Sequence, residues 1–154
     1  MTGLRESAGS SSRPGDTIVP SLILVVDEDP QIHQVVGRWL ADAGYDCMNA
    51  LTPRDARDIL RAGAAPTVVI LADQFREESG LSFAQRLIQR GRDLGLLFLA
   101  PLGSASELGG QLLGLPERIL VKPPSRRNLI VTVDELVLAV EAITRGCTQE
   151  RLEP

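Results

Sequence analysis

The feature that most constrains the fold is an apolar run, Leu22 to Val26, that stops abruptly at an acidic cluster. A run of five large apolar residues is too short for an ordinary helix and is typical of a strand buried on both faces of a parallel sheet. The acidic residues Asp27 and Glu28 follow the carboxyl end of this strand, where open α/β sheets bind their ligands. The sequence therefore predicts a site built around these two carboxylates.

Strand and helix patterns then alternate along the chain. Asp29 and Pro30 suit the cap and first turn of a helix, and apolar residues, Trp39 among them, recur at steps of three and four up to Gly44. Further strands are predicted at residues 46–50, 67–72, 96–100 and 118–121, and further helices at 53–62, 80–90, 104–113 and 125–144. Thr52 and Ser125 are the predicted caps of the second and the last helix. Because each parallel crossover needs a helix, we expect an α/β fold with a doubly wound, five-stranded parallel sheet and five helices.

Composition predicts one domain between two polar ends. Residues 1–19 are rich in Ser, Gly and Pro and are predicted to be a disordered tail, 20–145 the domain, and 146–154 a C-terminal tail. The net charge of -4 and the scattered basic residues argue against nucleic acid as a partner. Two cysteines without a pairing pattern and the lack of a membrane-spanning run or signal peptide favour a cytoplasmic protein without a membrane partner.

Together these patterns resemble the receiver domain of bacterial two-component response regulators, the CheY-like family with the flavodoxin-like strand order 2-1-3-4-5. The resemblance covers residues 21–144 and rests on the acid cluster, the strand at 66–71, Gly80 before the third helix, and Lys122 followed by Pro123. It implies that the first-strand acids help to bind Mg²⁺ and that an aspartate ending the third strand accepts a phosphoryl group. It also implies that a Ser or Thr ending the fourth strand moves toward this group and that the lysine contacts it.

The chain departs from the family pattern at the positions that carry the chemistry. The acceptor position, eight residues before Gly80, is Ala72, and the switch hydroxyl position, twenty-two residues before Lys122, is Ala100. The aromatic residue that is usual three positions before the lysine is replaced by Ile119. The proline that is usual in the loop after the acceptor is replaced by Arg76. The resemblance therefore implies a degenerate receiver, or pseudo-receiver, that lacks the phospho-acceptor.

Asp27, Glu28 and Lys122 remain as a residual acid pocket with its lysine. We expect Lys122 to pair with the acids, Mg²⁺ to bind weakly at most, and no other cofactor. The alternative is a phosphorylatable receiver that uses Asp73 as a displaced acceptor with Mg²⁺ in a histidine-kinase phosphorelay. Since side chains alternate along a strand, Asp73 should point away from the acids unless the strand end bulges.

No other residue pattern points to catalysis. His33, the one histidine, is expected on the polar surface of the first helix. Neither cysteine has a base nearby in the sequence, and Gly103 and the pair Gly109-Gly110 lack the strand-to-helix setting of a phosphate-binding loop. We therefore expect a protein that is not an enzyme.

The last predicted helix carries apolar residues on two sides. Its core-facing stripe is Leu129, Val133, Leu136 and Val140, and a second stripe on the opposite side is Val131, Leu138 and Ala142. The second stripe favours a partner face, although single exposed apolar residues are also common on ordinary surfaces. The predicted function is phosphorylation-independent contact with a histidine kinase, another response regulator or an output protein, with a homodimer through the last helix as a further expectation.

Overall fold

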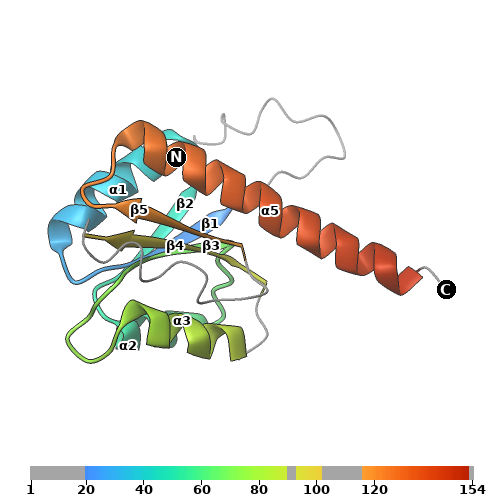
Figure 1. Cartoon of the computed structure of the whole chain (residues 1–154), viewed down its shortest axis with the longest axis horizontal. Helices are drawn as coiled ribbons and strands as arrows, with labels where there is room; N and C mark the ends of the chain where they lie inside the picture. Colours follow the sequence, from blue (N-terminus) through green and yellow to red (C-terminus); the bar gives the residue numbers. More distant parts are fainter. Residues whose placement is uncertain (1–19, 90–92, 102–115, 153–154) are drawn as a thin grey trace, which may run out of the picture.

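A computed structural model of the chain describes residues 20–89, 93–101 and 116–152 (Figure 1). The five strands in these ranges form one parallel sheet in the order β2-β1-β3-β4-β5. They are β1 (Leu22–Val26), β2 (Asp46–Ala50), β3 (Val68–Ala72), β4 (Gly95–Ala100) and β5 (Glu117–Val121). The predicted strand order is confirmed, and the predicted strands agree with the observed ones to within one residue at each end.

Helices cover both faces of the sheet. The helices in the described ranges are α1 (Pro30–Asp42), α2 (Pro53–Arg61), α3 (Gly80–Gln89) and α5 (Arg126–Leu152). Figure 1 shows α1 and α5 on one face of the sheet and α2 and α3 on the other. The tail predicted at 1–19 and the helix predicted at 104–113 lie outside the described residues. No helix in the described ranges combines the length and the hydropathy that a membrane crossing requires.

Three of these helices begin at polar residues that the sequence predicted as caps. The side-chain oxygens of Asp29, Thr52 and Ser125 accept backbone N–H groups two or three residues ahead, at 2.9, 3.0 and 3.1 Å. Each cap satisfies a donor that the first helical turn would leave without a partner. The caps explain why each helix starts directly after a strand or loop at a defined residue.

The core has two layers, because alternate residues of each strand point to opposite faces. One cluster lies between the sheet and α2 and α3, and Phe83 and Phe98 are its largest fully buried side chains. The other lies between the sheet and α1 and α5, and includes Leu40 and Leu129. Full burial of a side chain of this size contributes roughly 1.5–3 kcal/mol. The two layers hold the carboxyl ends of the strands in fixed positions.

The last helix is longer than predicted. We expected it to end near Thr144 and the residues from 146 to form a tail, but α5 continues to Leu152, so that expectation is wrong for 146–152. No proline interrupts residues 145–152, and a helix that is already nucleated adds further residues at low cost. In Figure 1 the final turns of α5 project beyond the sheet.

Candidate functional site

Sheet pairing continues one residue past the ends of three strands. The backbone N–H groups of Asp27, Asp73 and Lys122 each donate to a carbonyl oxygen of a neighbouring strand, at 3.1, 3.3 and 2.9 Å. The regular ladder therefore brings these three residues to the same edge of the sheet. We call the residues at this edge, Asp27, Glu28, Ala72, Ala100 and Lys122, the strand-end pocket.

Asp27 and Lys122 form an ion pair in this pocket. Lys122 Nζ lies 3.0 Å from Asp27 Oδ2, and the other oxygen, Oδ1, accepts the Asp29 N–H at 2.9 Å. The Asp27 side chain is 5% exposed and that of Lys122 is 27% exposed. Within the described ranges Oδ2 accepts no hydrogen bond of good geometry, so its contact with Lys122 is electrostatic. The structure thus brings together the acid and the lysine that the sequence predicted.

Glu28 turns toward the β3–α3 loop, residues 73–79. Its Oε2 accepts the Arg76 N–H at 2.9 Å. The loop is closed on itself by a bridge between Gln74 and Ser79 and by a hydrogen bond from the Phe75 N–H to the Glu78 carbonyl oxygen at 2.8 Å. One carboxylate oxygen of the predicted acid pair is therefore used to hold a loop.

Glu78 ties the same loop to two helices, and sequence reasoning missed it. Arg57 of α2 lies 3.2 Å from its carboxylate, and Nη2 of Arg86 in α3 lies 2.5 Å from both carboxylate oxygens. Burial alone would raise the pKa of Glu78, but the hydrogen bonds and positive charges of Arg86 and Arg57 outweigh it, so the pKa is lowered. Arg57 lies 21 residues before Glu78 and Arg86 lies 8 residues after it, and no local pattern marks them as partners.

The two positions at which the resemblance places the acceptor and the switch hydroxyl are both buried alanines. Ala72 ends β3 and is 4% exposed, and Ala100 ends β4 and is fully buried. Gly80 packs directly against this strand end, because a Cβ at residue 80 would lie 2.0 Å from the Ala72 carbonyl oxygen. Asp73 is buried as well, and its carbonyl oxygen accepts the Gly80 N–H at 2.8 Å.

The sequence led us to expect His33 on the polar surface of the first helix, but its ring contacts residues at two strand ends. Its Nε2 donates to the Asp27 carbonyl oxygen at 2.7 Å, and its Nδ1 lies 2.8 Å from Asn49 Oδ1. The ring is partly buried between α1 and the ends of β1 and β2. The polar face of a helix can point at a neighbouring strand end, and the helical period alone does not reveal that.

The two stripes of α5 lie on opposite sides of the helix. The core-facing stripe, Leu129, Val133, Leu136 and Val140, is buried, whereas Val131 and Leu138 are 45% and 62% exposed and Ala142 is exposed as well. The residues of the predicted partner face are therefore accessible at the surface.

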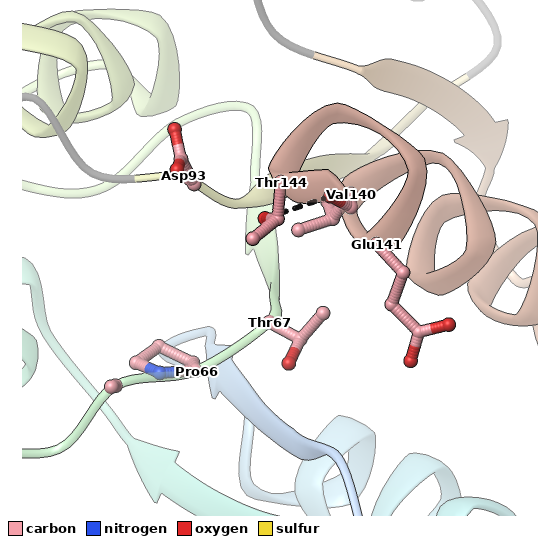
Figure 2. Close-up of a pocket in the computed structure, with 7 residues that line it drawn as sticks. Pro66, Thr67, Asp93, Val140, Glu141 and Thr144 are labelled. Atoms are coloured by element: carbon pink, nitrogen blue, oxygen red, sulfur yellow. Dashed lines mark hydrogen bonds between the residues drawn. The ribbon is translucent and has the colours of Figure 1, made fainter. Parts of the chain in front are cut away.

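A separate hollow of about 470 Å³ lies at the other edge of the sheet, where β3 begins. Figure 2 shows Thr67 and Pro66 on one side and the α5 residues Val140, Glu141 and Thr144 on the other. Thr144 Oγ1 donates to the Val140 carbonyl oxygen at 3.1 Å, so this hydroxyl is used within α5. The hollow is distinct from the strand-end pocket, because parallel strands begin and end at opposite edges of the sheet.

Comparisons with known proteins agree with this geometry. No family model matches the chain. Response regulator MprA of Mycolicibacterium vanbaalenii is 30% identical over 132 residues, which are 86% of this chain and 54% of MprA. Response regulator MprA of Mycobacterium sp. (strain KMS) is 29% identical over 119 residues, 77% of this chain and 51% of that protein. The chain thus spans about half the length of the curated relatives it matches.

Solved structures share the fold over almost their whole length. The chemotaxis response regulator CheY4 of Vibrio cholerae is 26% identical with a TM-score of 0.66, covering 77% of this chain and 99% of CheY4. A response regulator receiver domain protein from Clostridium thermocellum is alike in fold, with 18% identity, a TM-score of 0.72, and coverage of 80% and 98%. The chain is therefore a receiver domain, the signal-transduction module of response regulators.

Proposed function

We propose that this receiver domain signals through protein contact without accepting a phosphoryl group. The observation that carries the proposal is Ala72, a buried residue without a side-chain oxygen at the end of β3. In the strand-end pocket around it, the charge of Asp27 is already balanced by its ion pair with Lys122. Ala100 has no hydroxyl that could move toward a phosphoryl group. We therefore propose that the pocket is held in one state.

The regular end of β3 argues against Asp73 as a displaced acceptor. Its N–H continues the ladder with Leu99 O, so no bulge resets the alternation of side chains before residue 73. By that alternation Asp73 follows Val69 and Leu71, which face the α2–α3 cluster, whereas Asp27 follows Ile23 and Val25, which face the α1–α5 cluster. This alternation supports a placement of the two carboxylates on opposite sides of the sheet.

The donor set does not fit a Mg²⁺ site. Mg²⁺ prefers octahedral oxygen ligands and commonly takes carboxylates that are free to bind it. Here Asp27 is paired with the Lys122 ammonium and Glu28 with the Arg76 N–H, and Ala72 supplies no side-chain oxygen. In the described ranges no group of three or more His, Cys, Asp or Glu residues is arranged around a common point for a metal. We propose weak Mg²⁺ binding at most and no enzymatic turnover.

The partner in this proposal is a protein, contacted through the exposed stripe Val131, Leu138 and Ala142 of α5. The curated relatives are response regulators, so a histidine kinase, another response regulator or an output protein is the class of partner that we propose. A second copy bound through the same helix is the other candidate, because an exposed apolar helix face is suited to either.

The experiment that tests the proposal is a titration with Mg²⁺ and beryllofluoride, a phosphoryl mimic, followed by amide NMR shifts. We expect no saturable shifts at Asp27, Asp73 or Lys122. The control is Asp73→Ala. Saturable shifts in the natural protein that vanish in this variant would identify Asp73 as a working acceptor and would refute the proposal.

The α5 face is tested by Leu138→Glu, with Leu51→Glu as the matched control because Leu51 is exposed to 46% at the end of β2. We expect both variants to fold, since both side chains are already substantially exposed to solvent. Only Leu138→Glu should lose self-association in sedimentation equilibrium or co-purification of a protein partner from the host. Equal behaviour of the two variants would show that the stripe is ordinary surface.

A further inference from the structure

Two adjoining hollows run along α1 and share the side chain of Trp39. The first, of about 450 Å³, lies between α1 and α5 and is lined by Trp39, Ala43, Arg126, Arg127, Ile130 and Val131. The second is lined by Gln34, Val35, Arg38 and Trp39. We call the two hollows together the Trp39 groove. It lies on the face of the sheet that α1 and α5 cover, away from α2 and α3 (Figure 1).

The floor of the Trp39 groove is apolar and partly accessible. Trp39 and Ile130 each pack with one side against the core cluster between the sheet and α1 and α5, so core contacts hold the floor in place. Val35 and Val131 flank the groove and are 44% and 45% exposed. Val131 also belongs to the second stripe of α5, so the groove extends that stripe onto α1.

The rim of the groove is positively charged, although the whole chain carries a net charge of -4. It holds Arg38, Arg126 and Arg127, all of them exposed. Asp42 Oδ2 lies 3.8 Å from Arg126 Nη2, and these side chains are 52% and 61% exposed. An exposed pair at that distance is weak, so the arginines keep most of their attraction for a partner.

We infer that the Trp39 groove docks an acidic amphipathic helix of a protein partner. The inference rests on the proposed function, in which the domain acts through protein contact. Apolar side chains at i, i+3 or i+4, and i+7 of the docked helix would cover Trp39, Val35 and Val131, and its carboxylates would face the arginines. From Gln34 to Ala43 the lined part of α1 rises about 14 Å, enough for roughly nine residues of a docked helix.

The charges also argue against a second copy in this groove. A two-fold symmetric contact sets the same patch of both subunits face to face. Such a dimer would bring the three arginines of one groove close to the three arginines of the other, and like charges in a contact oppose association. A negatively charged partner removes this repulsion.

Trp39 itself reports on the groove, because it is the one tryptophan of the chain. The probe is a synthetic, tryptophan-free peptide helix with leucines on one face and glutamates elsewhere. Two control peptides have the same composition in scrambled order, or lysine in place of glutamate. We expect a saturable blue shift of Trp39 emission with the acidic amphipathic peptide alone, and weaker binding as salt is added.

The protein variant for this test is Arg126→Glu combined with Arg127→Glu, which should weaken peptide binding about tenfold or more. Arg61→Glu on α2 is the matched control, because the Arg61 and Arg126 side chains are each 61% exposed. We expect it to bind the peptide as the natural protein does. Circular dichroism of each variant establishes that the fold is kept.

Three results would overturn the inference: no shift of Trp39 emission, equal binding of the scrambled peptide, or undiminished binding by the Arg126 and Arg127 variant. Self-association of the natural protein that this variant abolishes would assign the groove to a second copy and would overturn it as well. The titration with Mg²⁺ and beryllofluoride tests the proposed function at other residues. A result against docking in the Trp39 groove, seen in Trp39 emission, can therefore be distinguished from a result against the proposed function, seen in amide NMR shifts.

Discussion

Lys122 Nζ lies 3.0 Å from Asp27 Oδ2, and this contact joins the end of β5 to the end of β1 across the two strands between them. Removing the lysine would leave a buried carboxylate without its counter-charge. We expect Lys122→Met to lower the free energy of unfolding by about 1–2 kcal/mol, less than for a fully buried pair because the Lys122 side chain keeps some contact with water. Urea unfolding measures the change.

The double variant Asp27→Asn with Lys122→Met separates charge from packing. The asparagine can still accept the Asp29 N–H, so most of the lost stability should return. A double variant as unstable as Lys122→Met alone would mean that the lysine acts through its packing and not through the ion pair.

Gly80 and Gly37 form a matched pair of glycines at helical positions. Gly80→Ala should destabilise the protein by at least about 2 kcal/mol, because its Cβ would lie 2.0 Å from the Ala72 carbonyl oxygen. Gly37→Ala should stabilise it by about 0.5–1 kcal/mol, since nothing lies within 4 Å and alanine is the better helix former. Thermal unfolding of the two variants compares them, and equal effects would contradict the close packing of α3 on β3.

Tyr45 makes stability depend on pH in alkaline solution. Its hydroxyl donates to Asp134 of α5, and burial, this hydrogen bond and the charges of Asp134 and Glu141 raise the pKa of Tyr45 above its ordinary value of 10.0. The unfolded chain would lose this proton first, so the contribution is fully present below pH 10.0 and is lost as the pH rises above it. We expect Tyr45→Phe to lower stability at neutral pH by about 1 kcal/mol and to flatten the alkaline loss.

The measurement for Tyr45 is urea unfolding between neutral and alkaline pH. It is made in a Cys47→Ala background, because burial also raises the pKa of the Cys47 thiol and would act in the same direction. An alkaline loss that is unchanged in Tyr45→Phe would contradict the assignment to this hydroxyl.

Glu78 makes the stability of the fold depend on pH in acidic solution. Although burial opposes ionisation, Arg86 and Arg57 lower the pKa of Glu78 below its ordinary value of 4.5, so its stabilising effect is present above pH 4.5 and is lost as the pH falls below it. We expect Glu78→Gln to cost about 1–2 kcal/mol at neutral pH and to reduce the loss of stability on acidification. Unfolding curves of the variant and the natural protein at several acidic pH values provide the comparison.

Most of the fold could be predicted because the signals were local. The strand at Leu22–Val26 was marked by its continuous apolar run, and the helix starts by the caps Asp29, Thr52 and Ser125, each readable within a few residues. The helix end near Thr144 could not be read in this way. The residues that follow are polar, and polarity alone does not distinguish an exposed helix from a tail.

The site was predicted in part. Asp27 and Lys122 were paired correctly, because both follow buried strands of one parallel sheet. The contacts of Glu78 and His33 could not be foreseen, since each depends on where a helix lies relative to a distant strand or loop. Trp39 was placed correctly in the core stripe of α1, but its second role arises only because α5 crosses beside it.

Backbone hydrogen bonds continue the sheet past β1, β3 and β5, and they shape the strand-end pocket. The shape of the pocket is therefore independent of the side chains that determine its chemistry. The pocket exists because main-chain amides reach across the sheet, and those bonds do not depend on which side chain stands at residue 72. A carboxylate can be exchanged for a methyl group there while the frame around it keeps its shape. The backbone of this architecture can thus stay the same whichever side chains stand at residues 72 and 100, so a receiver-like frame does not by itself fix how the domain is used.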